Sequence, residues 1–340
     1  MTYPGANASM SAPAAAICDI EVDLAAVRSA HARIAPHIHR TPVLSNGSLD
    51  DAVGSKLFFK CENLQRVAAF KARGACNAVL SLSAEEAKRG VVTHSSGNHG
   101  AALAWAARLR GIPAWIVMPS NAAQVKLDAV KGFGGTPRFC EPTVAAREAT
   151  CAAMEAETGA TLIHPYNDWR VIAGQGTAAL ELLEDEPDLD AVIAPVGGGG
   201  LLSGTAIVAK GIRPSIKAYG AEPAGADDAY RSLRAGRIIP QTDPHTIADG
   251  LRSSLGDKTF AVLSTNVDAI ETASEEAIVR AMRLLWEKLK MIVEPSSAVP
   301  LAVLLERKIS LDGLRVGVIL SGGNVDLDHL PWQRNTCAGP

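Results

Sequence analysis

The stretch of sequence that most constrains the fold is AVIAPVGGGGLLSG, residues 191–204. Its apolar first part, residues 191–196, predicts a buried strand of a parallel sheet, and Leu201 begins a predicted helix. Between them stand four consecutive glycines, Gly197, Gly198, Gly199 and Gly200. Glycine lets the backbone turn sharply and aim several N–H groups at one point beside a helix N-terminus, where an anion is stabilised. Because the loop contains no lysine or arginine, backbone N–H groups would hold that anion, and a phosphate is the simplest candidate.

Two other interpretations of this glycine loop stay open. It can be a tight turn between a strand and a helix that binds nothing. It can also belong to a dinucleotide-binding fold, although the G-x-G-x-x-G pattern would need a glycine where Leu202 or Ser203 stands. Glu222, which ends the next apolar run, lies at a plausible distance for an acid that binds the ribose of a dinucleotide.

Length and composition exclude several classes of protein. The chain has 340 residues, enough for about two domains and a large core. Its 33 basic and 36 acidic residues are mixed along the chain, so no basic stretch is available for nucleic acid. No apolar run approaches the roughly 20 residues that span a bilayer, so no membrane partner is expected. The six cysteines form no C-x-x-C pair and no secretion signal is found, which indicates reduced thiols in the cytoplasm.

The rest of the chain alternates between predicted strands and helices. Strands are expected at residues 56–60, 90–94, 217–220 and 315–320, with helical segments between them. This alternation is typical of an α/β fold with a parallel sheet covered on both faces. Residues 1–17 and 333–340 are expected to be tails, the first of them disordered.

Lys71 lies near the beginning of a segment with helical composition, residues 69–82. A lysine at such a position is usually a solvated surface residue. The neighbouring Ala69, Phe70, Ala72 and Ala75 are small or apolar, however. A lysine held in apolar surroundings has a lowered pKa and can act as a nucleophilic amine.

The sequence SSGNHG, residues 95–100, follows a predicted strand and leads into a helix. Its hydroxyl and amide side chains and exposed N–H groups can bind a carboxylate. An ordinary helix N-cap is the alternative, because Ser and Asn are favoured there for local reasons. His99 is expected to be packed or exposed rather than to bind a metal, since no second ligand stands at a suitable spacing.

Two further features lie at predicted strand ends. Glu222 and Asp228 could offer carboxylate oxygens to a divalent cation, although a solvated acidic loop explains them equally simply. Ser321 follows the last predicted strand, at the edge where open α/β sheets bind ligands. An amine, a phosphate loop, a carboxylate loop and a hydroxyl together suit pyridoxal phosphate and an amino-acid substrate. A dinucleotide-binding fold explains only the glycine loop.

The chain also resembles the fold-type II pyridoxal-phosphate enzymes, in the branch of serine racemase, serine/threonine dehydratase and 3-hydroxyaspartate dehydratase. The resemblance covers about residues 23–332 and rests on FFKCENLQ, AFKARGACNAV, THSSGNHGAAL, IAGQGTAALE, PVGGGGLLSG, GAEPAGADDAY, TIADGL, EPSSAV and LSGGNVD. It implies a tryptophan synthase β-like fold of two three-layer α/β/α domains with mostly parallel sheets. Residues 18–82 and 164–332 would form the large domain, and residues 83–163 a small mobile domain.

The resemblance also implies roles for individual residues. Lys71 would form the Schiff base with the cofactor, Phe70 and Asn98 would hold its ring and 3′-oxygen, and Ser321 would bond its pyridine nitrogen. The phosphate would be bound by Gly197, Gly198, Gly199 and Gly200. Ser96 would be the second acid/base. The substrate would be bound by Ser95, Ser96, Gly97, Asn98, His99, Arg147 and Ser253. A Mg²⁺ or Mn²⁺ site would be formed by Glu222, the Ala226 carbonyl and Asp228.

The expected activity is β-elimination of water from a β-hydroxy-α-amino acid, which gives a keto acid and ammonia. Racemisation of an amino acid is the alternative within this family, and a homodimer is implied. An NAD-dependent dehydrogenase and a non-catalytic binding protein are the alternatives from other classes. One stretch departs from the family, because Val67, Ala68 and Ala69 stand where the branch usually has a glycine-containing segment. A bulkier or more apolar substrate such as phenylserine therefore joins 3-hydroxyaspartate, threonine and serine as a candidate.

Overall fold

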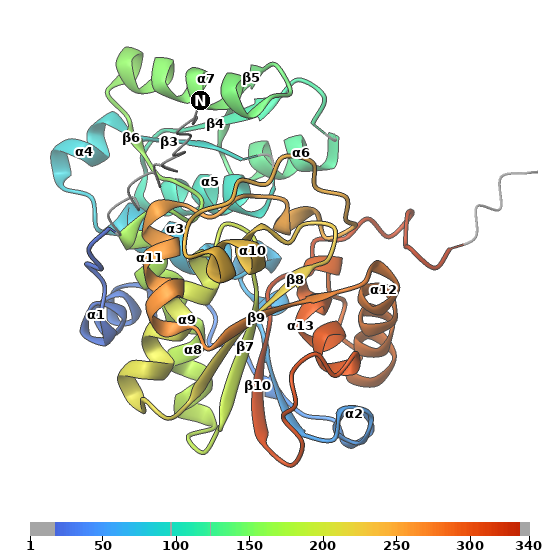
Figure 1. Ribbon diagram of the computed structural model, residues 1–340. Coiled ribbons are helices and arrows are strands. Elements are labelled where there is room, and N and C mark those ends of the chain that lie inside the picture. Colours follow the sequence, from blue (N-terminus) through green and yellow to red (C-terminus); the bar gives the residue numbers. More distant parts are fainter. Residues whose placement is uncertain (1–17, 96, 123, 334–340) are drawn as a thin grey trace, which may run out of the picture.

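The described residues form two separate sheets of mostly parallel strands, one of six strands and one of four (Figure 1). The structure is a computed structural model, which describes residues 18–95, 97–122 and 124–333. Ser96, residues 1–17 and residues 334–340 lie outside the described residues, so the expectations for Ser96 and for the tails refer to parts that are not described. The predicted α/β class with parallel sheets is confirmed.

The six-stranded sheet combines strands from distant parts of the chain. Its spatial order is β1 (Val43–Leu44), β2 (Lys56–Cys61), β10 (Arg315–Leu320), β7 (Ala191–Pro195), β8 (Lys217–Pro223) and β9 (Ala269–Ala273). Only the short edge strand β1 runs antiparallel to its neighbour. The last strand of the chain, β10, therefore lies between β2 and β7. All five residues of β7 are buried, as a central strand of a sheet covered on both faces requires.

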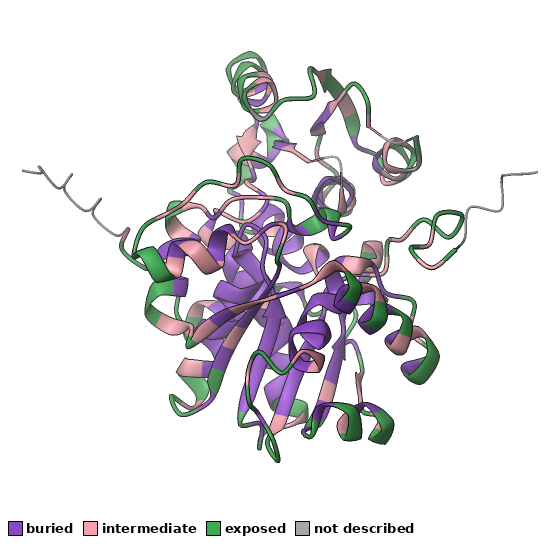
Figure 2. Ribbon diagram, turned by 45° about the vertical axis from the view of Figure 1, so that its right-hand side comes forward, coloured by how far each residue is buried: buried purple, intermediate pink, exposed green. Residues whose placement is uncertain are grey.

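Helices cover both faces of this sheet (Figure 1). One face packs against α1 (Leu24–Ile34), α8 (Trp169–Asp185), α9 (Gly200–Ile212) and α11 (Asp257–Asn266). The other face packs against α2 (Gly47–Val53), α12 (Glu275–Leu284) and α13 (Pro295–Leu305). Figure 2 shows this three-layer unit as the most deeply buried part of the molecule.

The four-stranded sheet has the order β5 (Thr136–Cys140), β4 (Ala114–Pro119), β3 (Val91–His94) and β6 (Thr161–Leu162), all parallel. One face packs against α3 (Lys71–Leu80), α5 (Asn98–Arg110) and α6 (Gln124–Gly132). The other face packs against α7 (Val144–Thr158). The short helices α4 (Ala84–Arg89) and α10 (Asp228–Ala235) complete the described set. None of the described helices is both long and apolar enough to cross a membrane.

Two predicted elements differ from the structure in ways that bear on the site. The helix predicted for residues 69–82 begins only at Lys71, because Ala69 is extended and pairs with Gly322. Strand β8 continues three residues beyond its predicted end at Gly220, since Glu222 pairs with Thr272 of β9, a strand that was not predicted. Lys71 thus stands at a helix start and Glu222 at a strand end.

Candidate active site

The glycine loop connects β7 to α9 and leaves its N–H groups free. Within the described part of the chain, the backbone N–H groups of Gly197, Gly198, Gly199 and Gly200 donate to no protein acceptor. Gly199 has a φ of 89°, which an L side chain rarely adopts. A Cβ atom on Gly198 would lie 2.2 Å from the ring of Tyr166, so this position admits no side chain. The loop is therefore closely packed on one side and offers several unsatisfied donors beside a helix N-terminus, as an anion site requires.

Lys71 is the first residue of α3, and its amine lies close to the glycine loop. Its Nζ donates to the carbonyl oxygen of Pro165 at 2.8 Å, and Pro165 precedes Tyr166, whose ring covers Gly198. Burial lowers the pKa of Lys71 to about 8, although the negative charge of Glu294 acts in the opposite direction. The predicted nucleophilic amine therefore stands in surroundings that favour its neutral form.

Ser321 follows β10 at the same edge of the large sheet and is buried. The N–H of Phe70 donates to the Ser321 carbonyl at 2.9 Å, which places Ser321 beside Lys71. The Ser297 hydroxyl donates to the Gly322 carbonyl at 2.6 Å, accepts from the Gly322 N–H at 2.6 Å, and lies 3.1 Å from the Ser321 hydroxyl. Because the single hydrogen of Ser297 is donated to Gly322, Ser297 offers its oxygen to Ser321 and holds the Ser321 hydroxyl in place. The sequence analysis did not identify Ser297.

The segment before Lys71 keeps a left-handed turn without glycine. Val67 and Ala68 have φ angles of 54° and 52°. Their carbonyls accept hydrogen bonds from the Asn324 side chain at 2.8 Å and from the Gly323 N–H at 2.9 Å. The departure from the family pattern thus preserves a turn that suits glycine, at the cost of backbone strain at a β-branched residue.

The loop of residues 95–100 starts α5 without a side-chain cap. The N-cap position is Gly97, whose N–H donates to the Ser95 hydroxyl at 3.3 Å. The ordinary N-cap interpretation is therefore not what the described residues show. His99 is buried, with Nε2 3.2 Å from the Ile163 carbonyl, and burial holds its pKa well below the usual value. His99 is thus a packed histidine, which is one of the two positions expected for it from the sequence.

Asn98 links this loop to the large sheet. Its Nδ2 lies 3.1 Å from each carboxylate oxygen of Glu294, and its Oδ1 accepts from Nδ2 of Asn324 at 2.9 Å. Glu294 is 4% exposed, and burial raises its pKa to about 7. The sequence analysis assigned no role to Glu294, although its position at the start of EPSSAV was the available signal.

Arg147 lies on α7, close enough to His94 for its charge to act on that ring, and His94 is the first of three neighbouring aromatic rings. The ring centroids of His94 and His164 are 5.3 Å apart, and those of His164 and Tyr166 are 4.6 Å apart. Burial lowers the pKa of His94, and the charge of Arg147 lowers it further. Arg147 makes one hydrogen bond among the described residues, from Nε to the Thr143 carbonyl at 3.4 Å, so its terminal nitrogens are available to a ligand. Ser253, partly buried, follows the turn Asp249–Leu251.

Glu222 and Asp228 are both completely buried, at the carboxyl end of β8 and the start of α10. Glu222 accepts from the N–H groups of Ala229 at 3.1 Å and Tyr230 at 2.7 Å. Asp228 Oδ2 accepts from the Leu255 N–H at 3.3 Å, while its buried Oδ1 has no partner in the described structure. Burial raises the pKa of both carboxyls, that of Asp228 to about 7, and Asp228 raises that of Glu222 further. Among the described residues, no cluster of three His, Cys, Asp or Glu side chains could hold a metal.

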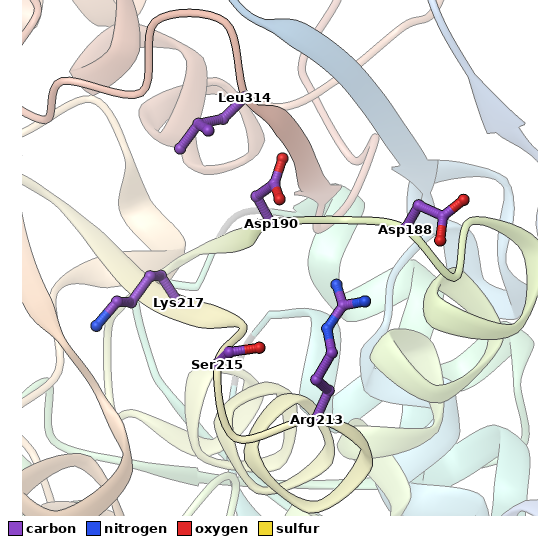
Figure 3. A pocket seen from close by; sticks show the side chains of 6 residues that line it. All are labelled: Asp188, Asp190, Arg213, Ser215, Lys217 and Leu314. Carbon is purple, nitrogen blue, oxygen red and sulfur yellow. The ribbon is translucent and has the colours of Figure 1, made fainter.

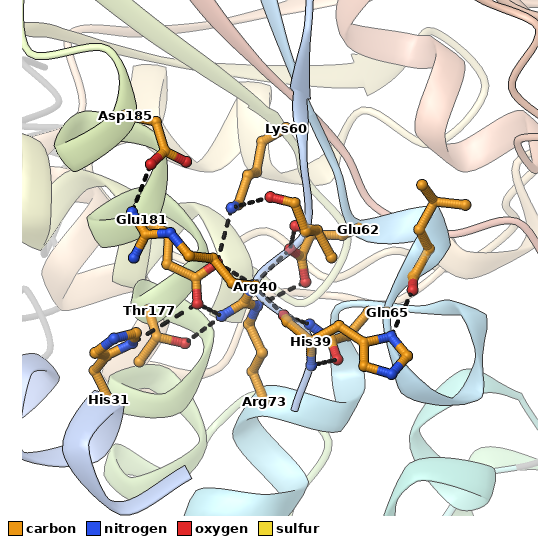
Figure 4. A network of polar contacts seen from close by, with 12 residues as sticks. His31, His39, Arg40, Lys60, Glu62, Gln65, Arg73, Thr177, Glu181 and Asp185 are labelled. Carbon is orange, nitrogen blue, oxygen red and sulfur yellow. Dashed lines mark hydrogen bonds and ion pairs between the residues drawn. The ribbon is translucent and has the colours of Figure 1, made fainter. Parts of the chain in front are cut away.

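Arg73, in the first turn of α3, belongs to a network of buried ion pairs (Figure 4). Arg73 forms two hydrogen bonds to Glu62 at 2.7 Å and two to Glu181 at 2.8 Å. Lys60 donates to Glu181 at 2.7 Å. Two cationic side chains thus pair with two carboxylates. The network joins β2, α3 and α8, and its member Arg73 stands two residues after Lys71. The sequence analysis did not predict this network.

The opposite edge of the large sheet holds a pocket of about 560 Å³ (Figure 3). Its lining contains charges of both signs, the exposed Asp188, Asp190 and Lys217 and the partly buried Arg213, together with Ser215 and Leu314. Asp190 precedes β7 and Lys217 begins β8, so this pocket faces the amino ends of the strands. Ligands of open α/β sheets bind at the carboxyl ends, where Lys71, the glycine loop and Ser321 meet.

Comparisons with known proteins agree with this geometry. Residues 34–322 match the family model described as pyridoxal-phosphate dependent enzyme. A β-hydroxyaspartate dehydratase of Paracoccus denitrificans is 53% identical over 305 residues, which cover 90% of this chain and 97% of the relative. The crystal structure of serine racemase from Dictyostelium discoideum superposes with a TM-score of 0.87 at 50% identity, over 90% of this chain and 99% of that one. The T.th. threonine deaminase superposes with a TM-score of 0.85 at 44% identity, over 90% and 99%.

The fold and the match over most of the chain define a class: this chain belongs to the pyridoxal-phosphate dependent enzymes. Within that class its relatives are fold-type II enzymes, which confirms the resemblance stated from the sequence motifs. The dinucleotide-binding interpretation of the glycine loop is thereby set aside.

Proposed function

We propose that this enzyme is a dehydratase that eliminates water from a β-hydroxy-α-amino acid and releases a keto acid and ammonia. The observation that carries the proposal is the position of Lys71. Within the described part of the chain, its partly buried amine donates to the Pro165 carbonyl, next to the glycine loop, whose N–H groups have no protein acceptor there, and beside Ser321. The names of the relatives, a β-hydroxyaspartate dehydratase and a threonine deaminase, support this reaction class.

The residues of the site fit pyridoxal phosphate. Lys71 would bond its carbonyl carbon, the four glycines would bind its phosphate, and Phe70, Asn98 and Ser321 would hold its ring. When bound, the cofactor supplies an electron sink for negative charge at the substrate Cα. Once the substrate amine has taken its place, Lys71 Nζ would be free to take the Cα proton and could pass a proton to the β-hydroxyl group, which would leave as water. The Pro165 carbonyl keeps Nζ at the site, and the lowered pKa of Lys71 provides the neutral amine that accepts the proton.

We propose that the carboxylates of the substrate are bound from the small sheet. Ser95, Gly97, Asn98 and the N-terminus of α5 would bind the α-carboxylate, with Ser96 as the second acid/base and the backbone N–H of His99 as a further donor. Arg147 and Ser253 would bind a second carboxylate, because the terminal nitrogens of Arg147 make no hydrogen bond among the described residues. 3-Hydroxyaspartate would then be preferred over threonine, serine and phenylserine. Arg147→Ala should remove that preference, and an unchanged preference would contradict this role.

We also propose a divalent cation, Mg²⁺ or Mn²⁺, at Glu222, Asp228 and the Ala226 carbonyl. The unpartnered Asp228 Oδ1 and the raised pKa values of both buried carboxyls fit a site where a cation is expected. The protein would supply only two carboxylates and one carbonyl oxygen to the cation. Water molecules would therefore occupy its remaining coordination positions.

The domain division and the assembly are further proposals. Residues 83–163 contain all four strands of the small sheet, which supports their movement as a unit against residues 18–82 and 164–332. We propose a homodimer on the basis of the family resemblance, and light scattering of the purified protein tests it. The described cysteines are all free, which supports a cytoplasmic location.

The decisive experiment is keto-acid release from L-serine, L-threonine, both 3-hydroxyaspartate diastereomers and phenylserine, with Mg²⁺ and with chelator. The purified enzyme should be yellow, borohydride should fix its cofactor to the protein, and the enzyme should release keto acid. Lys71→Ala should abolish both the fixation of the cofactor and the release of keto acid.

Racemisation is the second candidate, because serine racemases are among the relatives. If the D-isomer accumulates faster than keto acid in chiral analysis of the remaining substrate, racemisation is the main reaction.

A further inference from the structure

The side-chain amide of Asn98 is held by three groups that nothing above assigns to the reaction. They are Glu294, Asn324 and, through Asn324, the Val67 carbonyl. Asn98 belongs to the start of α5, whereas Glu294 and Asn324 belong to the segments before α13 and after β10. The contacts therefore join the small sheet to the large one at the cofactor site.

Only one orientation of the Asn98 amide satisfies these groups. Nδ2 of Asn324 donates both to the Val67 carbonyl at 2.8 Å and to Asn98 Oδ1 at 2.9 Å. If the Asn98 amide were turned over, its NH₂ group would face the Asn324 NH₂ group and its oxygen would face the Glu294 carboxylate. Two donors would then oppose each other, and so would two acceptors.

This orientation leaves one N–H of Asn98 unused. The two oxygens of Glu294 lie at equal distances of 3.1 Å from Nδ2, so they subtend a narrow angle and share one N–H. An amide NH₂ group has two hydrogens, and the second points away from Glu294. Within the described structure this second hydrogen has no acceptor. It is available to a ligand that carries a negative oxygen.

We propose that Glu294 and Asn324 are positioning residues, which fix the Asn98 amide so that its free N–H donates to the phenolic oxygen of the bound cofactor. The inference rests on the proposed cofactor role of Asn98 and adds what orients that residue. A donated hydrogen bond stabilises the anionic form of the oxygen. Loss of either positioning residue should therefore affect the bound cofactor even without substrate.

The test uses absorption spectra and cofactor affinity of holoenzymes without substrate. Asn98→Ala should lower the ratio of the long-wavelength band to the near-ultraviolet band and weaken cofactor binding by about 10-fold, because a hydrogen bond to a charged group is lost. Glu294→Gln and Asn324→Ala should shift the band ratio in the same direction. The Asn324 variant changes no charge, so it separates orientation of Asn98 from the charge of Glu294 near Lys71.

Double variants distinguish positioning from a general loss of packing. Asn98→Ala combined with Glu294→Gln, or with Asn324→Ala, should show no larger spectral shift than Asn98→Ala alone. Ser296→Ala is the matched control, because Ser296 is buried near Glu294 but bonds the Gly250 N–H instead. Its band ratio should equal that of the wild type.

Three outcomes would overturn the proposal. Glu294→Gln and Asn324→Ala with wild-type spectra would remove the positioning role while leaving Asn98 as a cofactor ligand. Additive shifts in the double variants would mean that the two residues act independently of Asn98. A wild-type spectrum for Asn98→Ala would refute both the cofactor role of Asn98 and the positioning of its amide. If Glu294→Gln does not fold, the Asn324→Ala arm decides alone.

Discussion

Two groups of buried charged side chains lie near the site, and they differ in the groups that compensate their charges. Lys60, Glu62, Arg73 and Glu181 are at most 1% exposed, and each contacts an opposite charge at 2.7 to 2.8 Å. Glu222 and Asp228 are equally buried but contact only backbone N–H groups. A buried charge is costly unless it is paired. The charges of the first group are therefore compensated within the protein, whereas the second group contacts no cationic side chain among the described residues and would be compensated by the cation proposed above.

The pKa values of the two groups reflect this difference. Burial alone would raise the pKa of Glu181, but the hydrogen bonds and charge of Arg73 bring it below its usual value. In contrast, burial raises the pKa of Asp228 from 3.8 to about 7, and among the described residues Asp228 forms no salt bridge that would lower it again. When folding lowers the pKa of a carboxyl, the protein loses stability as the pH falls. When folding raises the pKa of a carboxyl, the protein loses stability as the pH rises. The two groups should therefore respond to pH with opposite signs.

The largest expected effect is that of breaking the paired network. Arg73→Met leaves Glu62 and Glu181 buried with too little positive charge, so we expect a loss of about 3–5 kcal/mol in the free energy of unfolding. Denaturation with guanidinium chloride measures it. A loss below about 1 kcal/mol would mean that the network contributes no more than an exposed ion pair.

The second effect concerns the carboxylate pair. Without divalent metal, stability should fall as the pH rises from about 4 to about 7, because Asp228 loses its proton near pH 4 in the unfolded state but keeps it until about pH 7 in the folded state. Mg²⁺ at 100 times its Kd at pH 8 should restore about 2.7 kcal/mol, and the same Mg²⁺ concentration should give a smaller gain at pH 5, where the protonated carboxyls bind it more weakly. Thermal denaturation with Mg²⁺ and with chelator at both pH values tests this expectation.

Asp228→Asn is the matched variant for that measurement. It removes one buried negative charge, so the metal-free protein should lose less stability between pH 5 and pH 8 than the wild type. The response to Mg²⁺ should disappear. A full Mg²⁺ response in this variant would place the cation elsewhere.

A smaller effect is expected in the segment of chain between Glu62 and Arg73, which form one ion pair of the network. Glu62 and Arg73 close a loop that contains the left-handed Val67 and Ala68. Val67→Gly should relieve strain and raise the free energy of unfolding by about 1 kcal/mol, after the greater chain entropy of glycine is subtracted. Urea denaturation measures the gain, and Val79→Gly, in the regular helix α3, should instead destabilise the protein.

The smallest effect is expected from an exposed counterpart of the network. Arg40 bonds Glu184 at 2.9 Å and Asp185 at 2.5 Å, but its side chain is 49% exposed. Arg40→Met should cost at most about 1 kcal/mol, and the loss should shrink in high salt. A cost close to that of Arg73→Met would remove the distinction between the two kinds of ion pair.

The sequence predicted the parts of the site whose chemistry depends on local pattern. The glycine loop and Lys71 could be identified because a buried strand, a helix start and small neighbours are adjacent in the chain. The network around Arg73 could not, because Glu62 and Glu181 come from elements separated by more than 100 residues. Glu294 and Ser297 were missed for the same reason, since their partners Asn98 and Ser321 are distant in sequence. Strand β9 escaped prediction because it is a partly exposed edge strand with a mixed pattern.

The central place of β10 has a consequence for synthesis of the chain. All strands of the small sheet lie within residues 91–162, so that sheet can form while translation continues. The large sheet lacks the strand between β2 and β7 until residue 320 has left the ribosome, and Ser321 follows immediately. Until then β2 and β7 present unpaired edges that can associate with other chains. The nascent protein should therefore need protection by chaperones until its last strand is made, and it can bind its cofactor fully only after that.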